Sequence, residues 1–204
     1  LTKNLPVAAG IGGGSSDAAA TITALLDFWH IDGPVDGLDA LLLSLGTDVP
    51  VCALGTAARV RGVGEVTEPL SAALPPVYAV LVNPLIPCPT PAVFKALAPS
   101  DFSGDLRGCP PRFDNAADML TFLRVKHNDL TRAATAQVPD IETALSFLAL
   151  QEGCALARLS GSGATCFGLF ETPEKAAAAI RAKLTPDDRP TLFNVAAHIV
   201  LKGD

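Results

Sequence analysis

The sequence lacks an excess of basic residues, a long apolar run and a paired cysteine motif, and each absence excludes a class of protein. Fifteen Lys and Arg stand against 21 Asp and Glu, and the net charge of −6 argues against a nucleic-acid partner or an anionic membrane surface. No apolar run is long enough to cross a bilayer, and the N-terminus has no signal-peptide pattern. We therefore expect a soluble cytoplasmic protein.

Metal-binding and disulfide patterns are also missing. The five cysteines include no Cys-x-x-Cys pair, and the three histidines are equally dispersed. An odd number of cysteines fits reduced thiols better than a disulfide framework. The sequence predicts buried, unreactive thiols and no metal-ligating residues.

What is present is a globular composition, with 204 residues of which 49% are apolar and 18% charged. The chain starts at Leu1, and "LTKNLP" leads directly into a glycine loop, which indicates an N-terminally truncated chain. The paired prolines in "LSAALPPVY" mark a candidate domain boundary. We place one domain at residues 1–76 and a second at 77–204.

Local patterns predict an α+β fold. Helical spacing and cap signals predict helices over 15–29, 35–45, 90–97, 129–137, 141–149 and 173–183. Ser15, Ser16 and Asp17 supply N-cap chemistry to the first of these helices, and Thr90 caps the third, with Pro91 in its first position. Apolar runs predict strands over 49–54, 57–63, 78–82, 154–159, 165–170 and 195–200, with a surface loop over 98–115. The alternation of helices and strands in the C-terminal part favours an α+β sandwich.

The stretch "GIGGGSS" (10–16) stands directly before the first predicted helix. Free backbone N–H groups converge at a helix N-terminus, and the helix dipole favours an anion there. A Walker A loop does not fit, because no Gly-Lys-Ser/Thr follows, and a Rossmann fingerprint fits only loosely. The alternative is a glycine-rich turn, but a turn needs fewer than three consecutive glycines. We predict a phosphate-binding loop.

Two further features have an ordinary and a functional interpretation. The second glycine-serine loop, "SGSGA" (160–164), is either a hairpin turn or the other half of a polyphosphate cradle. Asp48, in "LGTDVPV", either satisfies nearby N–H groups or takes a proton from a kinase acceptor hydroxyl. Taken alone, each stretch favours the ordinary interpretation.

Together these pieces resemble the GHMP small-molecule kinases, the superfamily of galactokinase, homoserine kinase and mevalonate kinase. Residues 6–18 resemble the second, phosphate-binding motif of that superfamily, and residues 159–170 resemble its third. More narrowly, "GIGGGSSDAAA", "LGTDVPVCALG", "HNDL" and "RLSGSGATCFGLF" are similar to members that act in the non-mevalonate isoprenoid route. Asn128-Asp129-Leu130 also matches, but its local chemistry is that of a helix cap, and we interpret it as structural.

The resemblance implies a ribosomal-protein-S5-like ATP domain, incomplete here, followed by a ferredoxin-like domain. It implies phosphorylation by ATP with Mg²⁺, the acceptor being the 2-hydroxyl of a methylerythritol linked to cytidine diphosphate. The partner is then this small molecule and not a nucleic acid or a membrane, and the protein is a monomer or homodimer. Asp48 is the implied catalytic carboxylate. Implied ATP-binding residues are Lys3, Pro6, Gly10, Ile11, Gly12, Gly13, Gly14, Ser15 and Ser16. Implied substrate-binding residues are Asp17, Thr47, Thr90, Phe94, Gly161, Ser162 and Gly163.

Three alternatives stay open at this point. Phe94, on a helix with Val93 and Leu97, is either the cytosine-facing aromatic or a core residue. The chain is either this cytidyl-substrate kinase or another GHMP small-molecule kinase. It is also compatible with an inactive nucleotide-binding fragment, because the family's first motif, whose lysine pairs with Asp48, is absent from this sequence.

Overall fold

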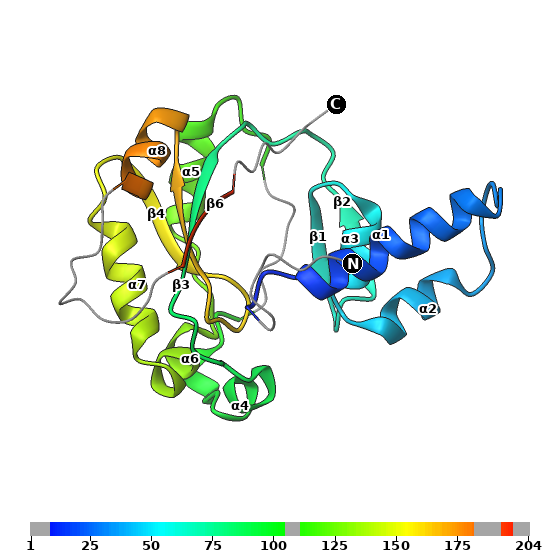
Figure 1. Ribbon diagram of the computed structural model, residues 1–204, viewed down its shortest axis with the longest axis horizontal. Coiled ribbons are helices and arrows are strands. Elements are labelled where there is room, and N and C mark those ends of the chain that lie inside the picture. Colours follow the sequence, from blue (N-terminus) through cyan, green and yellow to red (C-terminus); the bar gives the residue numbers. More distant parts are fainter. Residues whose placement is uncertain (1–8, 105–110, 182–192, 198–204) are drawn as a thin grey trace. The chain divides into compact units, whose positions relative to one another are not determined.

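The computed structural model describes residues 9–104, 111–181 and the backbone of 193–197, and divides the chain into two compact units (Figure 1). The smaller unit is built from Gly12–Ala73, and the larger from Leu74–Gly108 and Arg112–Lys202. The segment that ends at Ile11 also belongs to the larger unit. The chain therefore passes from one unit to the other inside the first glycine loop, between Ile11 and Gly12.

The smaller unit holds three helices and a β-hairpin: α1 (Gly13–Phe28), α2 (Leu38–Leu45), α3 (Val49–Leu54), β1 (Ala58–Arg61) and β2 (Val66–Pro69). Its core is thin. Ala19, Leu42 and Val49 are buried together, one from each helix, and a few half-buried apolar side chains pack around them. Small alanines on α1 permit this close approach of the helices.

Several predictions for the smaller unit were wrong. Residues 49–54 form α3 and not a strand, because Pro50 stands in the first turn, where a helix tolerates it, and Gly55 ends the helix at a φ of 68°. The N-cap of α1 is Gly12, at a φ of 65°, and no side chain caps the helix, so Ser15, Ser16 and Asp17 lie inside it. The predicted helix over 35–45 begins only at Leu38, and strand β2 was not predicted.

The larger unit is built on a four-stranded sheet of β3 (Tyr78–Asn83), β4 (Cys154–Leu159), β5 (Cys166–Phe170) and β6 (Phe193–Ala197). All pairs are antiparallel, and the strand order is β4-β5-β3-β6. Helices connect β3 to β4 and β5 to β6, which gives the β-α-β-β-α-β topology of ferredoxin-like folds. The predicted α+β class is confirmed.

The helices of the larger unit are α4 (Thr90–Lys95), α5 (Ala116–Arg124), α6 (Thr131–Gln137), α7 (Asp140–Ala149) and α8 (Pro173–Arg181), with a short 3-10 turn over Pro99–Asp101. Helix α5, capped by the Asn115 side chain, was not predicted. The ends of two predicted elements, 182–183 and 198–200, lie outside the described residues. No helix within the described part of the chain is both long and apolar enough to cross a membrane.

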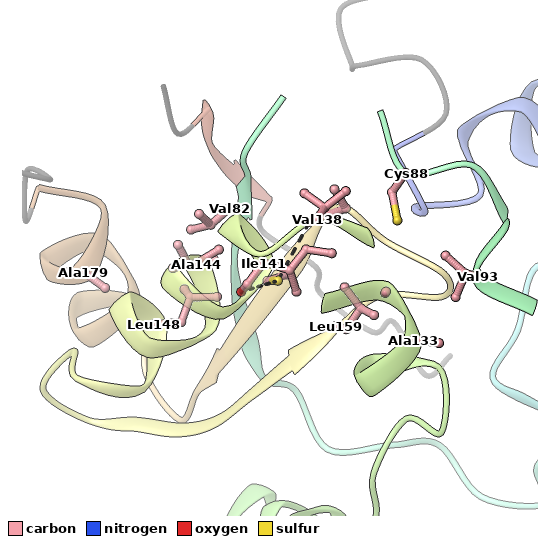
Figure 2. Packing of buried hydrophobic residues seen from close by; sticks show 14 of the residues in the cluster. Val82, Cys88, Val93, Ala133, Val138, Ile141, Ala144, Leu148, Leu159 and Ala179 are labelled. Atoms are coloured by element: carbon pink, nitrogen blue, oxygen red, sulfur yellow. Dashed lines mark hydrogen bonds between the residues drawn. The ribbon is translucent and has the colours of Figure 1, made fainter. Parts of the chain in front are cut away.

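Two apolar clusters cover the two faces of this sheet. Val80, Val82 and Phe170 pack with α7 and α8 on one face, around the fully buried Ile141 and Leu148 (Figures 1 and 2). On the other face Val77 packs with Met119 and Leu120 of α5, against the partly buried Leu169. Phe170 and Leu169 are neighbours in β5, so the period of two in a strand sends them to opposite faces.

Replacing Leu148 by alanine tests the larger core. Leu148 is fully buried, so Leu148→Ala leaves a cavity and should lower the free energy of unfolding by about 2–5 kcal/mol in a denaturant titration. Leu150→Ala is the matched control, because Leu150 is 83% exposed and should change the stability by less than about 0.5 kcal/mol. Equal losses for the two variants would contradict the packing of α7 on the sheet.

Gly64, in the turn of the β1–β2 hairpin, tests the smaller unit. A Cβ at this position would lie 2.1 Å from the Thr47 carbonyl oxygen. Gly64→Ala should therefore lower the melting temperature clearly more than Gly33→Ala. The two glycines have φ angles of 109° and 95°, but a Cβ on Gly33 meets nothing within 4 Å, so the comparison isolates the close approach from the backbone strain. Similar melting temperatures would show that the hairpin does not pack on Thr47.

Candidate functional site

The start of the first glycine loop contacts the second glycine loop within the larger unit. The Ser160 hydroxyl donates to the Gly10 carbonyl oxygen at 2.7 Å, and the Thr165 amide donates to the Ala9 carbonyl at 3.2 Å. Residues 150 positions apart in the sequence are thereby joined by direct hydrogen bonds. The sequence predicted two separate glycine loops, and the structure shows that the second one holds the entrance of the first.

Gly10 is the residue that allows this contact. Its φ is +71°, and a Cβ here would lie 2.5 Å from the Gly163 carbonyl oxygen and 2.7 Å from that of Ser160. Any side chain here would push the two loops apart. A residue with a Cβ would also be strained in this left-handed backbone conformation. The contact therefore requires glycine at position 10.

The second loop, residues 160–164, connects the antiparallel strands β4 and β5, so the hairpin interpretation is correct as far as it goes. Inside the loop, the Ser160 amide donates to Thr165 and the Gly163 amide donates to Ser160. The amides of Gly161 and Ser162 donate to no other residue in the described part of the chain. Neighbouring free amides of this kind form a concavity that suits an anion.

Thr90 lies against this second loop. Its hydroxyl is 2.7 Å from the Ser162 hydroxyl, and the Cys88 thiol donates to the Ser162 carbonyl oxygen at 3.3 Å. Burial raises the pKa of the Cys88 thiol, which keeps it protonated as this donor. The prediction that Thr90 caps its helix was wrong. Pro89 is the N-cap of α4, and Thr90 is the first helical residue, so its side chain is available for Ser162.

Phe94 lies one turn further along α4, and positions four residues apart share a helix face. Its side chain is 56% exposed, whereas its neighbour Val93 is completely buried. The interpretation of Phe94 as a core residue is therefore wrong. An exposed aromatic ring one turn from Thr90 is available to stack on a planar ligand.

In the smaller unit, the N-terminus of α1 presents backbone donors. The first hydrogen bond of the helix runs from the Ser16 amide to the Gly12 carbonyl at 2.9 Å. The amides of Gly13, Gly14 and Ser15 have no acceptor among the described residues, and no side chain caps them. This is the arrangement of a phosphate-binding helix terminus. Asp17 lies in the second turn of α1, where its carbonyl oxygen accepts from the Thr21 hydroxyl.

Asp48 lies at the start of α3 with an exposed side chain. It makes no cap hydrogen bond to its own helix, and no ion pair or hydrogen bond of its carboxylate is found among the described residues. The interpretation of Asp48 as an Asp that satisfies local N–H groups is therefore wrong. Burial, and secondly the charge of Asp48, raise the pKa of the Cys52 thiol one turn away. The backbone of the preceding residue, Thr47, lies close to Gly64 of the hairpin.

Lys3 and Pro6 lie outside the described residues. Ile11 is the last residue of the glycine loop that belongs to the larger unit. Over residues 9–104 and 111–181, no group of three or more His, Cys, Asp and Glu side chains is arranged to hold a metal ion.

Asn128 makes contacts that the sequence interpretation did not foresee. It was taken for a helix cap, but its side-chain nitrogen donates to the carbonyl oxygens of Leu159 and Gly161, at 3.1 and 2.7 Å. The second glycine loop is thus held from a segment that carries no glycine. The signal in the sequence is an asparagine whose NH₂ group is not needed by the cap itself.

Comparisons with known proteins agree on one family. The GHMP kinases N-terminal domain matches residues 1–56, and the GHMP kinases C-terminal domain matches residues 106–184. A relative from Cereibacter sphaeroides, named 4-diphosphocytidyl-2-C-methyl-D-erythritol kinase, is 50% identical over 185 residues, which are 89% of this chain and 65% of the relative. A relative of the same name from Paramagnetospirillum magneticum is 48% identical over 179 residues, 88% of this chain and 62% of the relative.

Solved structures give the same result. The crystal structure of a 4-(cytidine 5'-diphospho)-2C-methyl-D-erythritol kinase matches with a TM-score of 0.70 and 36% identity, over 88% of this chain and 64% of that one. A homoserine kinase from Cytophaga hutchinsonii matches with a TM-score of 0.55 and 16% identity, over 89% of this chain and 62% of that one, and shares the fold. This chain spans less than two thirds of the length of each of these proteins. On both the sequence and the fold, the chain belongs to the GHMP kinase family.

Proposed function

We propose that the protein transfers a phosphoryl group from Mg·ATP to the 2-hydroxyl of 4-diphosphocytidyl-2-C-methyl-D-erythritol, a step of the non-mevalonate isoprenoid route. The observation that carries the proposal is the pair of glycine loops, joined at Gly10 and Ser160. Five amides in and directly after these loops have no acceptor among the described residues: those of Gly13, Gly14, Ser15, Gly161 and Ser162. The relatives named for this reaction support the choice of substrate.

GHMP kinases use ATP as the phosphate donor. In this chain the first glycine loop and the N-terminus of α1 would hold the triphosphate, through the amides of Gly13, Gly14 and Ser15 and the hydroxyls of Ser15 and Ser16. Lys3 and Pro6 would lie near the nucleotide. Bound Mg²⁺ would neutralise charge on the phosphates, and it needs few protein ligands because it keeps phosphate oxygens and water.

Asp48 would be the base. Its carboxylate would accept the proton of the 2-hydroxyl as that oxygen attacks the γ-phosphorus in line, while the bond from phosphorus to the ADP oxygen breaks. The exposure of Asp48 and its lack of a partner among the described residues support this role, because a carboxylate already engaged in a cap would be a poor base. Thr47, whose backbone lies close to Gly64, would contact the acceptor beside Asp48.

The acceptor would bind to residues of α4 and the second loop. The Thr90 and Ser162 hydroxyls, 2.7 Å apart, would bind polar groups of the methylerythritol diphosphate, and the free amides of Gly161 and Ser162 would receive its negative charge. Phe94, more than half exposed one turn further along α4, would stack on the cytosine ring. Asp17, which would repel phosphate, would face substrate hydroxyls.

Asp48→Asn tests the catalytic role in the full-length protein. The amide cannot accept the proton, so kcat should fall by roughly 10²–10⁴-fold, while the Kd for Mg·ATP from titration calorimetry should stay within about twofold. Asp39→Asn is the control, because Asp39 is an exposed carboxylate in the first turn of α2 and should retain parental kcat. Parental turnover in Asp48→Asn would remove Asp48 from the mechanism.

Phe94→Ala tests the cytidine contact. Loss of one base-stacking ring should raise the KM for the cytidyl substrate by roughly 5- to 100-fold, with an unchanged KM for ATP. The melting temperature should change little, since the ring is 56% exposed. Phe102→Ala, which removes a ring that is 62% exposed in the same unit, should alter neither constant. An unchanged KM for the cytidyl substrate would show that Phe94 does not contact the base.

A further inference from the structure

Asn128 uses every hydrogen-bonding group of its side chain. The Oδ1 atom accepts from the Leu130 amide at 3.0 Å and forms a turn before α6. The Nδ2 atom donates to the Leu159 carbonyl at 3.1 Å and to the Gly161 carbonyl at 2.7 Å. The side chain thus has two separable tasks. The oxygen shapes its own segment, and the nitrogen binds the second glycine loop.

The two carbonyls held by Asn128 flank Ser160. Ser160 is the residue whose hydroxyl donates to Gly10, and Gly161 begins the pair of free amides. A peptide plane fixes its carbonyl and amide in opposite directions, so holding the Gly161 carbonyl also fixes the direction of the Ser162 amide. In the same way, holding the Leu159 carbonyl fixes the direction of the Ser160 amide, which lies in the same peptide plane.

Other contacts of the loop secure different atoms. Cys88 donates to the Ser162 carbonyl, and the buried Asn83 side chain donates to the Thr165 hydroxyl at 2.8 Å. Within the described part of the chain, Asn128 is the residue whose side chain binds the Gly161 carbonyl. Among the described residues, no other side chain donates to this carbonyl.

The segment that carries Asn128 is itself well fixed. The Thr131 amide and hydroxyl both donate to the Asn128 carbonyl, and the adjacent Asp129 carboxylate accepts from the Ser103 amide at 2.8 Å. The Ser103 hydroxyl also donates to this carboxylate, and the hydrogen bonds from the Ser103 hydroxyl and then from its amide lower the pKa of Asp129. Asn128 therefore acts on the loop from an anchored position.

From this geometry we propose that Asn128 is a positioning residue for the phosphoryl-transfer site: its side-chain NH₂ holds the Leu159 and Gly161 carbonyls so that the Ser162 amide is directed toward the anionic acceptor substrate. The proposal rests on the proposed function. It assigns to Asn128 a role in binding the acceptor through the loop, without contact to the substrate itself.

The test is Asn128→Asp in the full-length protein. The carboxylate keeps an oxygen for the Leu130 amide, so the turn before α6 is preserved, but it cannot donate and it repels both carbonyls. We expect kcat/KM for 4-diphosphocytidyl-2-C-methyl-D-erythritol to fall at least tenfold, mainly through KM, with the KM for ATP within twofold of the parent. A purely structural role would instead lower the active fraction, which reduces kcat and leaves both KM values unchanged.

Two further variants keep the test decisive. Asn128→Ser, which offers a smaller side chain that cannot reach both carbonyls, should show the same KM pattern if Asn128→Asp does not fold. Asn115→Ala removes the side chain that caps α5 and should cost stability without changing either KM. Parental kcat/KM in both Asn128 variants, or a loss confined to kcat, would overturn the proposal. A parent protein that does not phosphorylate this substrate would instead overturn the proposed function.

Discussion

The hydrogen bond from the Ser160 hydroxyl to the Gly10 carbonyl is the interaction on which the arrangement of the candidate site depends. It fixes the entrance of the first glycine loop on the second, and it demands that position 10 carry no side chain. Immediately after Ile11 the chain enters the cap of α1, where three amides have no acceptor among the described residues. One contact in the larger unit therefore fixes the chain immediately before the uncapped N-terminus of α1.

The backbone carbonyls and the backbone amides of the second glycine loop differ in their hydrogen-bond partners. Its carbonyls are bound, by Asn128 at Leu159 and Gly161 and by Cys88 at Ser162, whereas the amides of Gly161 and Ser162 donate to no described residue. Because these carbonyl oxygens are hydrogen-bonded and these two amides are not, the loop presents N–H groups that attract negative charge. Under the proposed function both substrates carry phosphates, and such a loop would provide fixed dipoles for them without a lysine or arginine side chain.

The sequence predicted the sheet of the larger unit well, because its strands are apolar runs bounded by clear turn residues. It failed at residues 49–54, where a six-residue apolar run is compatible with either a strand or a short helix and only Pro50 in the first turn distinguishes them. It also failed at the cap of α1. Ser15 and Ser16 are strong cap residues, but the left-handed Gly12 begins the helix before them.

The two glycine loops and Asp48 could be proposed as site residues from the sequence, because glycine clusters and a carboxylate between Gly46 and Pro50 are local features; their roles stay predictions. The joining of Gly10 to Ser160 and the reach of Asn128 to Gly161 were not predictable, because they connect residues 150 and 33 positions apart. Local patterns show what a residue can do to its neighbours. They do not show which distant carbonyl a side-chain amide will bind.

The chemical identity of the reaction product tests whether the protein transfers a phosphoryl group to a cytidyl alcohol. The full-length protein would be incubated with Mg·ATP and 4-diphosphocytidyl-2-C-methyl-D-erythritol, and the reaction followed by phosphorus NMR. A new phosphomonoester resonance should grow in step with ADP, and added CDP should inhibit the reaction. ADP formation only with an alcohol that carries no cytidine, or no phosphomonoester at all, would contradict the proposed function.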